Sequence, residues 1–175
     1  MQQELSPQCH YFIQDDSCKR FNPAGPQHAQ VAACRGVLDY FDAVHRRHGG
    51  GDAAASAPAM ASLHTLLSTH EAELAAPLLD YLHHSPHARL LGKADGKDGD
   101  RAATIAFKPL RKGSSDVATA LHLRGIGAEW GHFYAPRLLA NLDIDPDQGV
   151  VRVSLVHYNS LPEVQRILTA LDAVL

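Results

Sequence analysis

Residues 149–160 read GVVRVSLVHYNS, and apolar and polar side chains alternate along them as they do in a half-buried strand. Arg152 and Ser154 fall on one face of such a strand. The opposite face carries Val151, Val153 and Leu155. We predict a strand over 150–158, with one face packed on helices and the other available for polar chemistry.

The residues that follow this strand predict a helix. Ser160 and Glu163 have the spacing of a capping box, in which the two residues satisfy free backbone N–H groups of the first turn. The inner side of this helix is expected to carry Leu161, Val164, Leu168 and Leu171.

Towards the N-terminus, apolar residues at helical spacing predict two long helices, over 27–48 and 58–84. Pro77 lies within the second pattern and predicts a kink or a junction between two helices. The shorter elements expected after residue 86 are strands over 89–92, 101–107 and 128–134 and helices over 114–124 and 135–142, with Ser114 or Ser115 as a helix cap.

This order of elements predicts an α/β chain of the α+β type. A small, mostly antiparallel sheet has helices on one face and is preceded by two long helices. The Gly- and Ala-rich residues 49–57 mark a soft break between those helices. We therefore expect residues 1–57 to end a large-domain-like segment and residues 58–175 to form a C-terminal small domain.

The composition excludes several classes of protein. Sixteen basic and 19 acidic side chains are interspersed and aromatic residues make up 6%, so no nucleic-acid surface is expected. No apolar run approaches the roughly 20 residues that a membrane-spanning helix needs. The three cysteines form no CxxC pair, which favours a reducing, cytoplasmic setting. His83 and His87 lack further ligands nearby, so no metal site is predicted.

Three segments resemble the class V aminotransferases and cysteine desulfurases. Residues 125–135, GIGAEWGHFYA, are similar to the family's G-I-x-V-x-x-G-x-x-x-A segment, and residues 20–28, RFNPAGPQH, to its F-x-x-G-T-P-N loop. The most specific match is the pattern R-x-S-x-x-x-Y-N-[ST] with a later Glu, which is met by Arg152, Ser154, Tyr158, Asn159, Ser160 and Glu163. The resemblance is closest to a cysteine-desulfurase-like branch in which GHFYA replaces the cysteine-bearing loop.

The resemblance implies a pyridoxal 5'-phosphate (PLP) enzyme of fold type I that acts on an amino acid. Arg152 would bind the α-carboxylate of the substrate through two parallel hydrogen bonds. The strand pattern alone leaves open a structural ion pair at a sheet edge. His132, with Phe133 and Tyr134, would line the mouth of the substrate site, and a structural role is the alternative.

Tyr134 stands where the resembling cysteine desulfurases carry their nucleophilic cysteine. A phenol cannot accept a persulfide sulfur as a thiolate does, so we expect no conventional desulfurase activity. The resemblance also implies that Ala24 and Gly25 approach the cofactor phosphate across a dimer interface. Gly25 occupies the usual Thr position of that loop, and an ordinary loop before a helix is the alternative.

The resemblance implies a Schiff-base lysine in a large domain that would precede Met1. None of the five lysines lies in the family's Ser/His-x-x-Lys context: Lys19, Lys93, Lys97, Lys108 and Lys112. We therefore expect the C-terminal portion of a PLP enzyme, which supplies substrate-binding residues but no catalytic residue, and which forms a homodimer or joins the missing N-terminal half. The alternative is a non-catalytic small domain that binds a separately encoded N-terminal half or another partner.

Overall fold

The computed structural model describes residues 28–48, 57–95 and 101–175, so the predicted cofactor-binding residues Ala24 and Gly25 lie outside the described part. The chain divides into two compact units, Met1–Leu63 and His64–Leu175. This division does not test the predicted domains over 1–57 and 58–175, which stay predictions. Among the described residues, no helix is long and apolar enough to cross a membrane.

The first unit contains helix α3 (His28–Arg47) and the beginning of helix α4 (Ala57–His84). Both helices agree with the predicted ranges within one residue. An ion pair joins Arg35 Nε to Asp39 Oδ1 at 2.8 Å across one turn of α3. Large apolar side chains of α3 are nevertheless exposed to solvent: Val37 (54%), Leu38 (45%) and Tyr40 (46%).

The second unit is built on a four-stranded sheet with the order β1-β2-β4-β3, and all three strand pairs are antiparallel. The strands are β1 (Ala88–Leu91), β2 (Thr104–Pro109), β3 (Glu129–Gly131) and β4 (Val150–Ser154). The small antiparallel sheet predicted from the sequence is confirmed.

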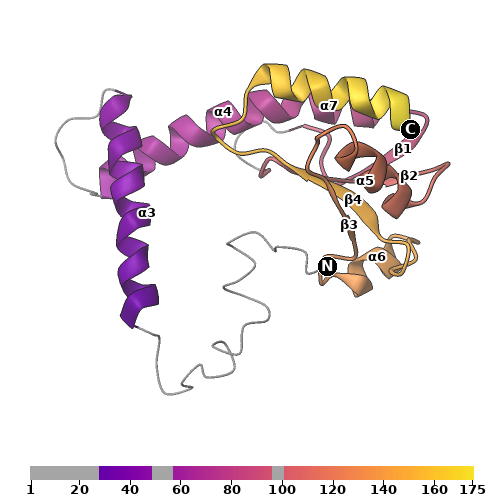
Figure 1. Cartoon of the computed structure of the whole chain (residues 1–175), viewed down its shortest axis with the longest axis horizontal. Helices are drawn as coiled ribbons and strands as arrows, with labels where there is room; N and C mark the ends of the chain where they lie inside the picture. Colours follow the sequence, from indigo (N-terminus) through magenta and orange to yellow (C-terminus); the bar gives the residue numbers. More distant parts are fainter. Residues whose placement is uncertain (1–27, 49–56, 96–100) are drawn as a thin grey trace. The chain divides into compact units, whose positions relative to one another are not determined.

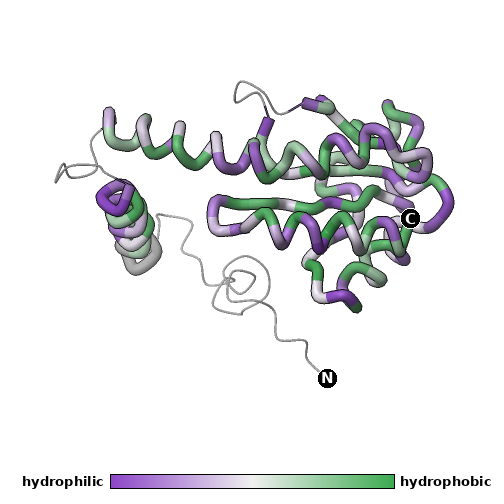
Figure 2. The backbone as a smooth tube through the Cα atoms, turned by 90° about the horizontal axis from the view of Figure 1, so that it is seen from above, coloured by the Kyte–Doolittle hydropathy of each residue, from purple (hydrophilic) through white to green (hydrophobic). Residues whose placement is uncertain are grey.

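Three helices cover one face of this sheet: the part of α4 after Leu63, α5 (Ser114–His122) and α7 (Leu161–Val174). In Figure 1, α4 and α7 lie above the sheet, and Figure 2, from above, shows them running side by side. The core between helices and sheet includes Leu74, Leu78, Phe107, Val151, Val153, Val164 and Leu171, each at most 2% exposed. Burying each such side chain contributes about 1.5–3 kcal/mol.

The short helix α6 (Pro136–Asn141) lies beyond the lower end of β3 and β4 in Figure 1. A smaller apolar cluster of Leu139, Ile144 and Val150 forms here, and Phe133, Ala106, Leu91 and Leu142 pack against it. Arg89 of β1 donates a hydrogen bond from Nη1 to the Leu142 carbonyl at 2.8 Å, which fastens the end of α6 to the sheet edge.

Strand β4 is shorter than predicted, because it ends at Ser154 and not at Tyr158. The Asn159 amide oxygen accepts a hydrogen bond from the Val156 N–H at 2.9 Å, and the Asn159 N–H donates to the Val156 carbonyl at 2.8 Å. These two bonds close a turn and use the backbone groups that a continued strand would offer to a neighbour.

Three further predictions need correction. Gly113 holds the N-cap position of α5, and Ser114 is 1% exposed because its hydroxyl donates inwards to the Gly149 carbonyl at 3.0 Å. Helix α4 is one element that continues through Pro77, so a junction of two helices is wrong there. Leu161 is 53% exposed at the first position of α7, whereas Val164 and Leu171 are buried as predicted.

Candidate functional site

The segment between β3 and α6 makes a turn with an unusual backbone. Strand β3 ends at Gly131, short of the predicted Tyr134, and the next residues reverse the chain. Phe133 and Tyr134 have φ values of 47° and 60°, in the left-handed region that bulky side chains rarely adopt. Such conformations cost on the order of 1–3 kcal/mol each and cluster at binding and catalytic sites.

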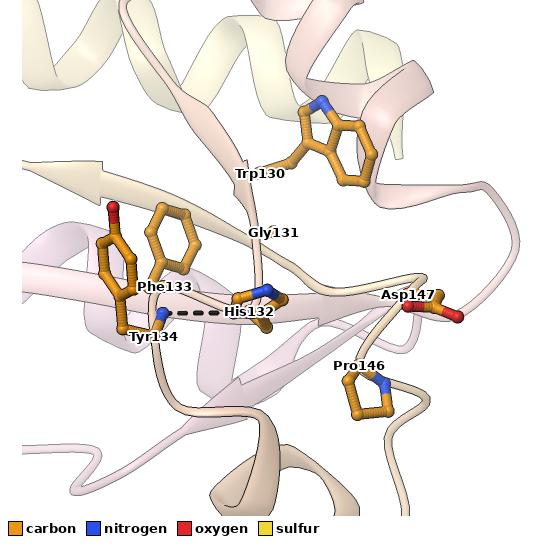
Figure 3. A pocket seen from close by; sticks show the side chains of 7 residues that line it. All are labelled: Trp130, Gly131, His132, Phe133, Tyr134, Pro146 and Asp147. Carbon is orange, nitrogen blue, oxygen red and sulfur yellow. Dashed lines mark hydrogen bonds between the residues drawn. The ribbon is translucent and has the colours of Figure 1, made fainter. Parts of the chain in front are cut away.

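Hydrogen bonds accepted by His132 hold this turn. The Tyr134 N–H donates to His132 Nδ1 at 3.1 Å, the interaction drawn in Figure 3, and the Ala135 N–H donates to the His132 carbonyl at 2.8 Å. Because Nδ1 accepts the first of these hydrogen bonds, the proton of the neutral imidazole ring lies on Nε2. The predicted substrate residue His132 therefore shapes the turn, while its own side chain stays exposed.

A shallow hollow of about 420 Å³ opens beside this turn. Figure 3 shows the Phe133 and Tyr134 rings on one side of it and Pro146 and Asp147 on the other. The described lining residues are Trp130, Gly131, His132, Phe133, Tyr134, Pro146 and Asp147. Tyr134 is 96% exposed, so the hollow is a surface feature of this chain, and a ligand in it would meet mainly aromatic side chains.

Arg152 lies in the middle of β4, with Ala106 of β2 and Glu129 of β3 as its cross-strand neighbours. The flanking Val151 and Val153 are buried on the helix-covered face, so the predicted separation of the two strand faces is confirmed. The guanidinium is half-buried, and its Cζ lies over the Phe133 ring, 4.0 Å from the ring centroid.

The alternative interpretation of Arg152 was a structural ion pair at a sheet edge. Within the part of the chain that the structure describes, no carboxylate oxygen lies within 4.0 Å of the Arg152 guanidinium, even though Glu129 is opposite in register. Among the described residues, the guanidinium contacts the face of the Phe133 ring, which attracts a cation but carries no neutralising charge. A half-buried guanidinium of this kind is suited to bind an external carboxylate.

The loop after β4 connects this strand to α4 and α7. His70 of α4 contacts the Asn159 carbonyl through Nε2 at 3.1 Å, and His157 Nδ1 lies 4.0 Å from Glu71 Oε1. At its far end, the Glu163 carboxylate accepts hydrogen bonds from the Ser160 N–H at 2.7 Å and hydroxyl at 2.8 Å. Asn159 and Ser160 of the sequence motif thus anchor the end of the strand that carries Arg152, whereas Tyr158 is 75% exposed.

Two of the lysines that the structure describes, Lys108 and Lys112, have their amines held by other groups of the chain. Lys108 donates from Nζ to Ser114 Oγ at 3.3 Å and to the Gly149 carbonyl at 3.2 Å, and Lys112 donates to the Val174 carbonyl at 2.6 Å. A Schiff-base lysine needs an amine that faces the cofactor aldehyde. Lys19 and Lys97 lie outside the described ranges. Within residues 28–48, 57–95 and 101–175, no three His, Cys, Asp or Glu side chains gather as a metal site.

The structure brings together two of the three predicted substrate residues, His132 and Tyr134, in the hollow, and it links Arg152 to them through Phe133. Of the other lining residues, Phe133 is expected at the substrate mouth together with His132 and Tyr134, whereas Trp130 and Asp147 have no predicted role.

The small antiparallel sheet and the helices that cover it have the fold of a type I PLP-dependent protein. Residues 53–167 match the family model for class V aminotransferases, and the chain belongs to that family. Class V aminotransferases and cysteine desulfurases depend on PLP.

Two curated relatives support this assignment. An aminotransferase-like protein of Gibberella zeae is 36% identical over 110 residues, which is 62% of this chain and 27% of the relative. A cysteine desulfurase-like protein of Aspergillus flavus is 33% identical over 107 residues, 59% of this chain and 24% of the relative. The chain thus spans about a quarter of the length of these relatives.

Solved structures agree with the fold. The cysteine desulfurase CsdA of Escherichia coli superposes with a TM-score of 0.52 at 27% identity, covering 61% of this chain and 25% of that one. A cysteine desulfurase of Thermococcus onnurineus gives a TM-score of 0.53 at 25% identity, covering 66% of this chain and 29% of that one.

Proposed function

We propose that this chain supplies the substrate-carboxylate site of a PLP-dependent enzyme that acts on an amino acid. Arg152 would bind the α-carboxylate, and the hollow with His132 and Tyr134 would form the mouth of the substrate site. The observation that carries the proposal is a half-buried guanidinium that no described carboxylate neutralises. Family membership and the motif around Arg152 support the same assignment.

The lysine that binds PLP would come from a polypeptide other than these 175 residues. Ala24 and Gly25 are proposed, from the family motif alone, to approach the cofactor phosphate. In this arrangement the bound cofactor would supply the electron sink for chemistry at the substrate's α-carbon. The residues of this chain would bind and orient the substrate, and Lys108 and Lys112, held by Ser114 and backbone carbonyls, would take no part.

A carboxylate titration of the isolated chain tests the proposal. L-alanine should shift the NMR signal of the Arg152 Nε–H group saturably. Arg152→Gln should weaken this binding about ten- to hundredfold, since hydrogen bonds to a charged group contribute roughly 1.5–3 kcal/mol. Arg152→Lys should recover only part of the affinity, because an ammonium lacks the planar fork of donors.

The matched control is Arg111→Gln, which removes the same charge from an exposed side chain remote in sequence from the motif. Equal binding of L-alanine by wild type and Arg152→Gln would overturn the proposed function. Equal weakening by Arg111→Gln would also overturn it, because binding would then depend on net charge alone.

A second proposal concerns association: the chain forms a homodimer or joins a separate subunit that carries the PLP lysine. The exposed Val37, Leu38 and Tyr40 of α3 support it, because adjacent large apolar side chains on a helix are commonly covered by a partner. Light scattering at micromolar concentration should give a mass above that of one chain. A monomeric mass, unchanged after addition of the large domain of a family member, would refute association.

A further inference from the structure

We infer that Phe133 is a positioning residue for Arg152: its ring holds the guanidinium so that the N–H donors stay available to a ligand carboxylate. The inference deepens the proposed function and rests on it, since it assumes that Arg152 binds a carboxylate. The contact itself is independent of that assumption, because the Arg152 Cζ lies 4.0 Å from the Phe133 ring centroid in the absence of any ligand.

The distance identifies a cation–π contact, which extends to about 6 Å from the ring centroid. Arg152 donates no hydrogen bond to a side chain or carbonyl in the described ranges, so this ring is its main restraint there. A guanidinium that rests on an aromatic ring is held through its flat face. Its hydrogen-bond donors lie in the plane of the group and remain free for a carboxylate.

An aromatic ring suits this task better than an acidic side chain. A carboxylate next to Arg152 would occupy the same N–H donors that a ligand carboxylate needs. Glu129 is the cross-strand partner of Arg152, yet it forms no ion pair with it within 4.0 Å. The site therefore stabilises the cation without a competing anion among the residues that the structure describes.

The backbone explains how the ring reaches Arg152. The left-handed conformations of Phe133 and Tyr134 turn the chain back directly after β3, and the His132 side chain accepts a hydrogen bond that closes the turn. Phe133 also packs against the apolar cluster of Leu139, Ile144 and Val150, which limits the motion of its ring. The strained backbone of Phe133 and Tyr134 thus holds the Phe133 ring in a fixed position over β4.

Side-chain NMR of the full chain tests the inference without any cofactor. In wild type, the Arg152 side-chain protons should resonate upfield because of the ring current of Phe133, and the Nε–H group should be as ordered as the backbone. Phe133→Leu should abolish the upfield shift, lower this order, and weaken L-alanine binding roughly fivefold. Phe133→Tyr keeps an aromatic ring and should leave all three quantities near wild type.

The outcomes separate this inference from the proposed function. If the upfield shift is lost in Phe133→Leu but wild type binds no L-alanine, the contact is real and the proposed function is wrong. If L-alanine binds equally to wild type and Phe133→Leu, the positioning role is wrong and the proposed function survives. Absence of the upfield shift in wild type would overturn the inference even if Phe133→Leu does not fold.

Discussion

Of the described glycines, Gly149 leaves the least room for a side chain, so its replacement with alanine tests the packing of the backbone directly. Its φ is 56°, and an added Cβ would lie 2.6 Å from the Gly131 carbonyl carbon and Cα. Real Cβ atoms do not approach backbone atoms this closely, and rigid backbone of β3 cannot move aside like the end of a side chain. We therefore expect Gly149→Ala to separate the ends of β3 and β4.

Two contributions set the size of the effect. A left-handed conformation costs a residue with a Cβ about 1–2 kcal/mol. Overpacking against fixed atoms typically costs about 1–3 kcal/mol more. We expect Gly149→Ala to lower the free energy of unfolding by about 2–5 kcal/mol, measured by urea denaturation with circular dichroism.

Gly127→Ala is the matched control, because no atom lies within 4 Å of its added Cβ and its backbone needs no glycine. It should change the free energy of unfolding by less than about 0.5 kcal/mol, and a small stabilisation is expected from reduced freedom of the unfolded chain. A loss below about 1 kcal/mol for Gly149→Ala would refute the close contact of Gly149 with Gly131.

Two further predictions concern pH. The pKa of Glu163 is lowered, first by the hydrogen bond from the Ser160 hydroxyl and then by the hydrogen bond from the Ser160 N–H. The Glu163 carboxylate therefore stabilises the folded chain above the unfolded pKa of about 4.3. This stabilisation is lost as the pH falls through the pKa of the folded state. Glu163→Gln should remove the loss of stability that wild type shows as the pH falls below about 4.3, measured as urea midpoints, and an unchanged profile would contradict it. Burial, followed by a hydrogen bond with Asp172, raises the pKa of Tyr81 from 10.0 to about 12. The stabilisation from the Tyr81 phenol should be complete below pH 10 and decline as the pH rises towards 12. Tyr81→Phe should flatten that decline in the free energy of unfolding. An alkaline titration in which Tyr81 ionises near its ordinary pKa would refute this prediction.

The sequence predicts the features that depend on short-range periodicity. The alternation along residues 150–154 places β4 and its two faces correctly, and the four-residue capping box places the start of α7. Both patterns lie within a few neighbouring residues, and packing of the apolar face on helices stabilises what the pattern predicts.

The features that the sequence missed depend on contacts between distant residues. Ser114 has the chemistry of a helix cap, but its hydroxyl binds the Gly149 carbonyl, 35 positions away, and is buried there. The alternation of side chains alone would extend strand β4 beyond Ser154. The strand ends there because the Asn159 amide oxygen accepts a hydrogen bond from the Val156 N–H. Phe133 adopts a left-handed conformation that its own propensity opposes, so only the surrounding structure can determine it.

We expect the position of the Phe133 ring over Arg152 to depend on the contact between Gly149 and Gly131. The close contact of the two glycines sets the end of β3, the left-handed turn starts there, and the turn places the Phe133 ring over Arg152. If this is so, Gly149→Ala should reduce the upfield shift of the Arg152 side chain although residue 149 does not touch it. Gly127→Ala should leave that shift unchanged. A normal Arg152 signal in folded Gly149→Ala protein would show that the turn is held by His132 and the apolar cluster alone, independently of the glycine contact.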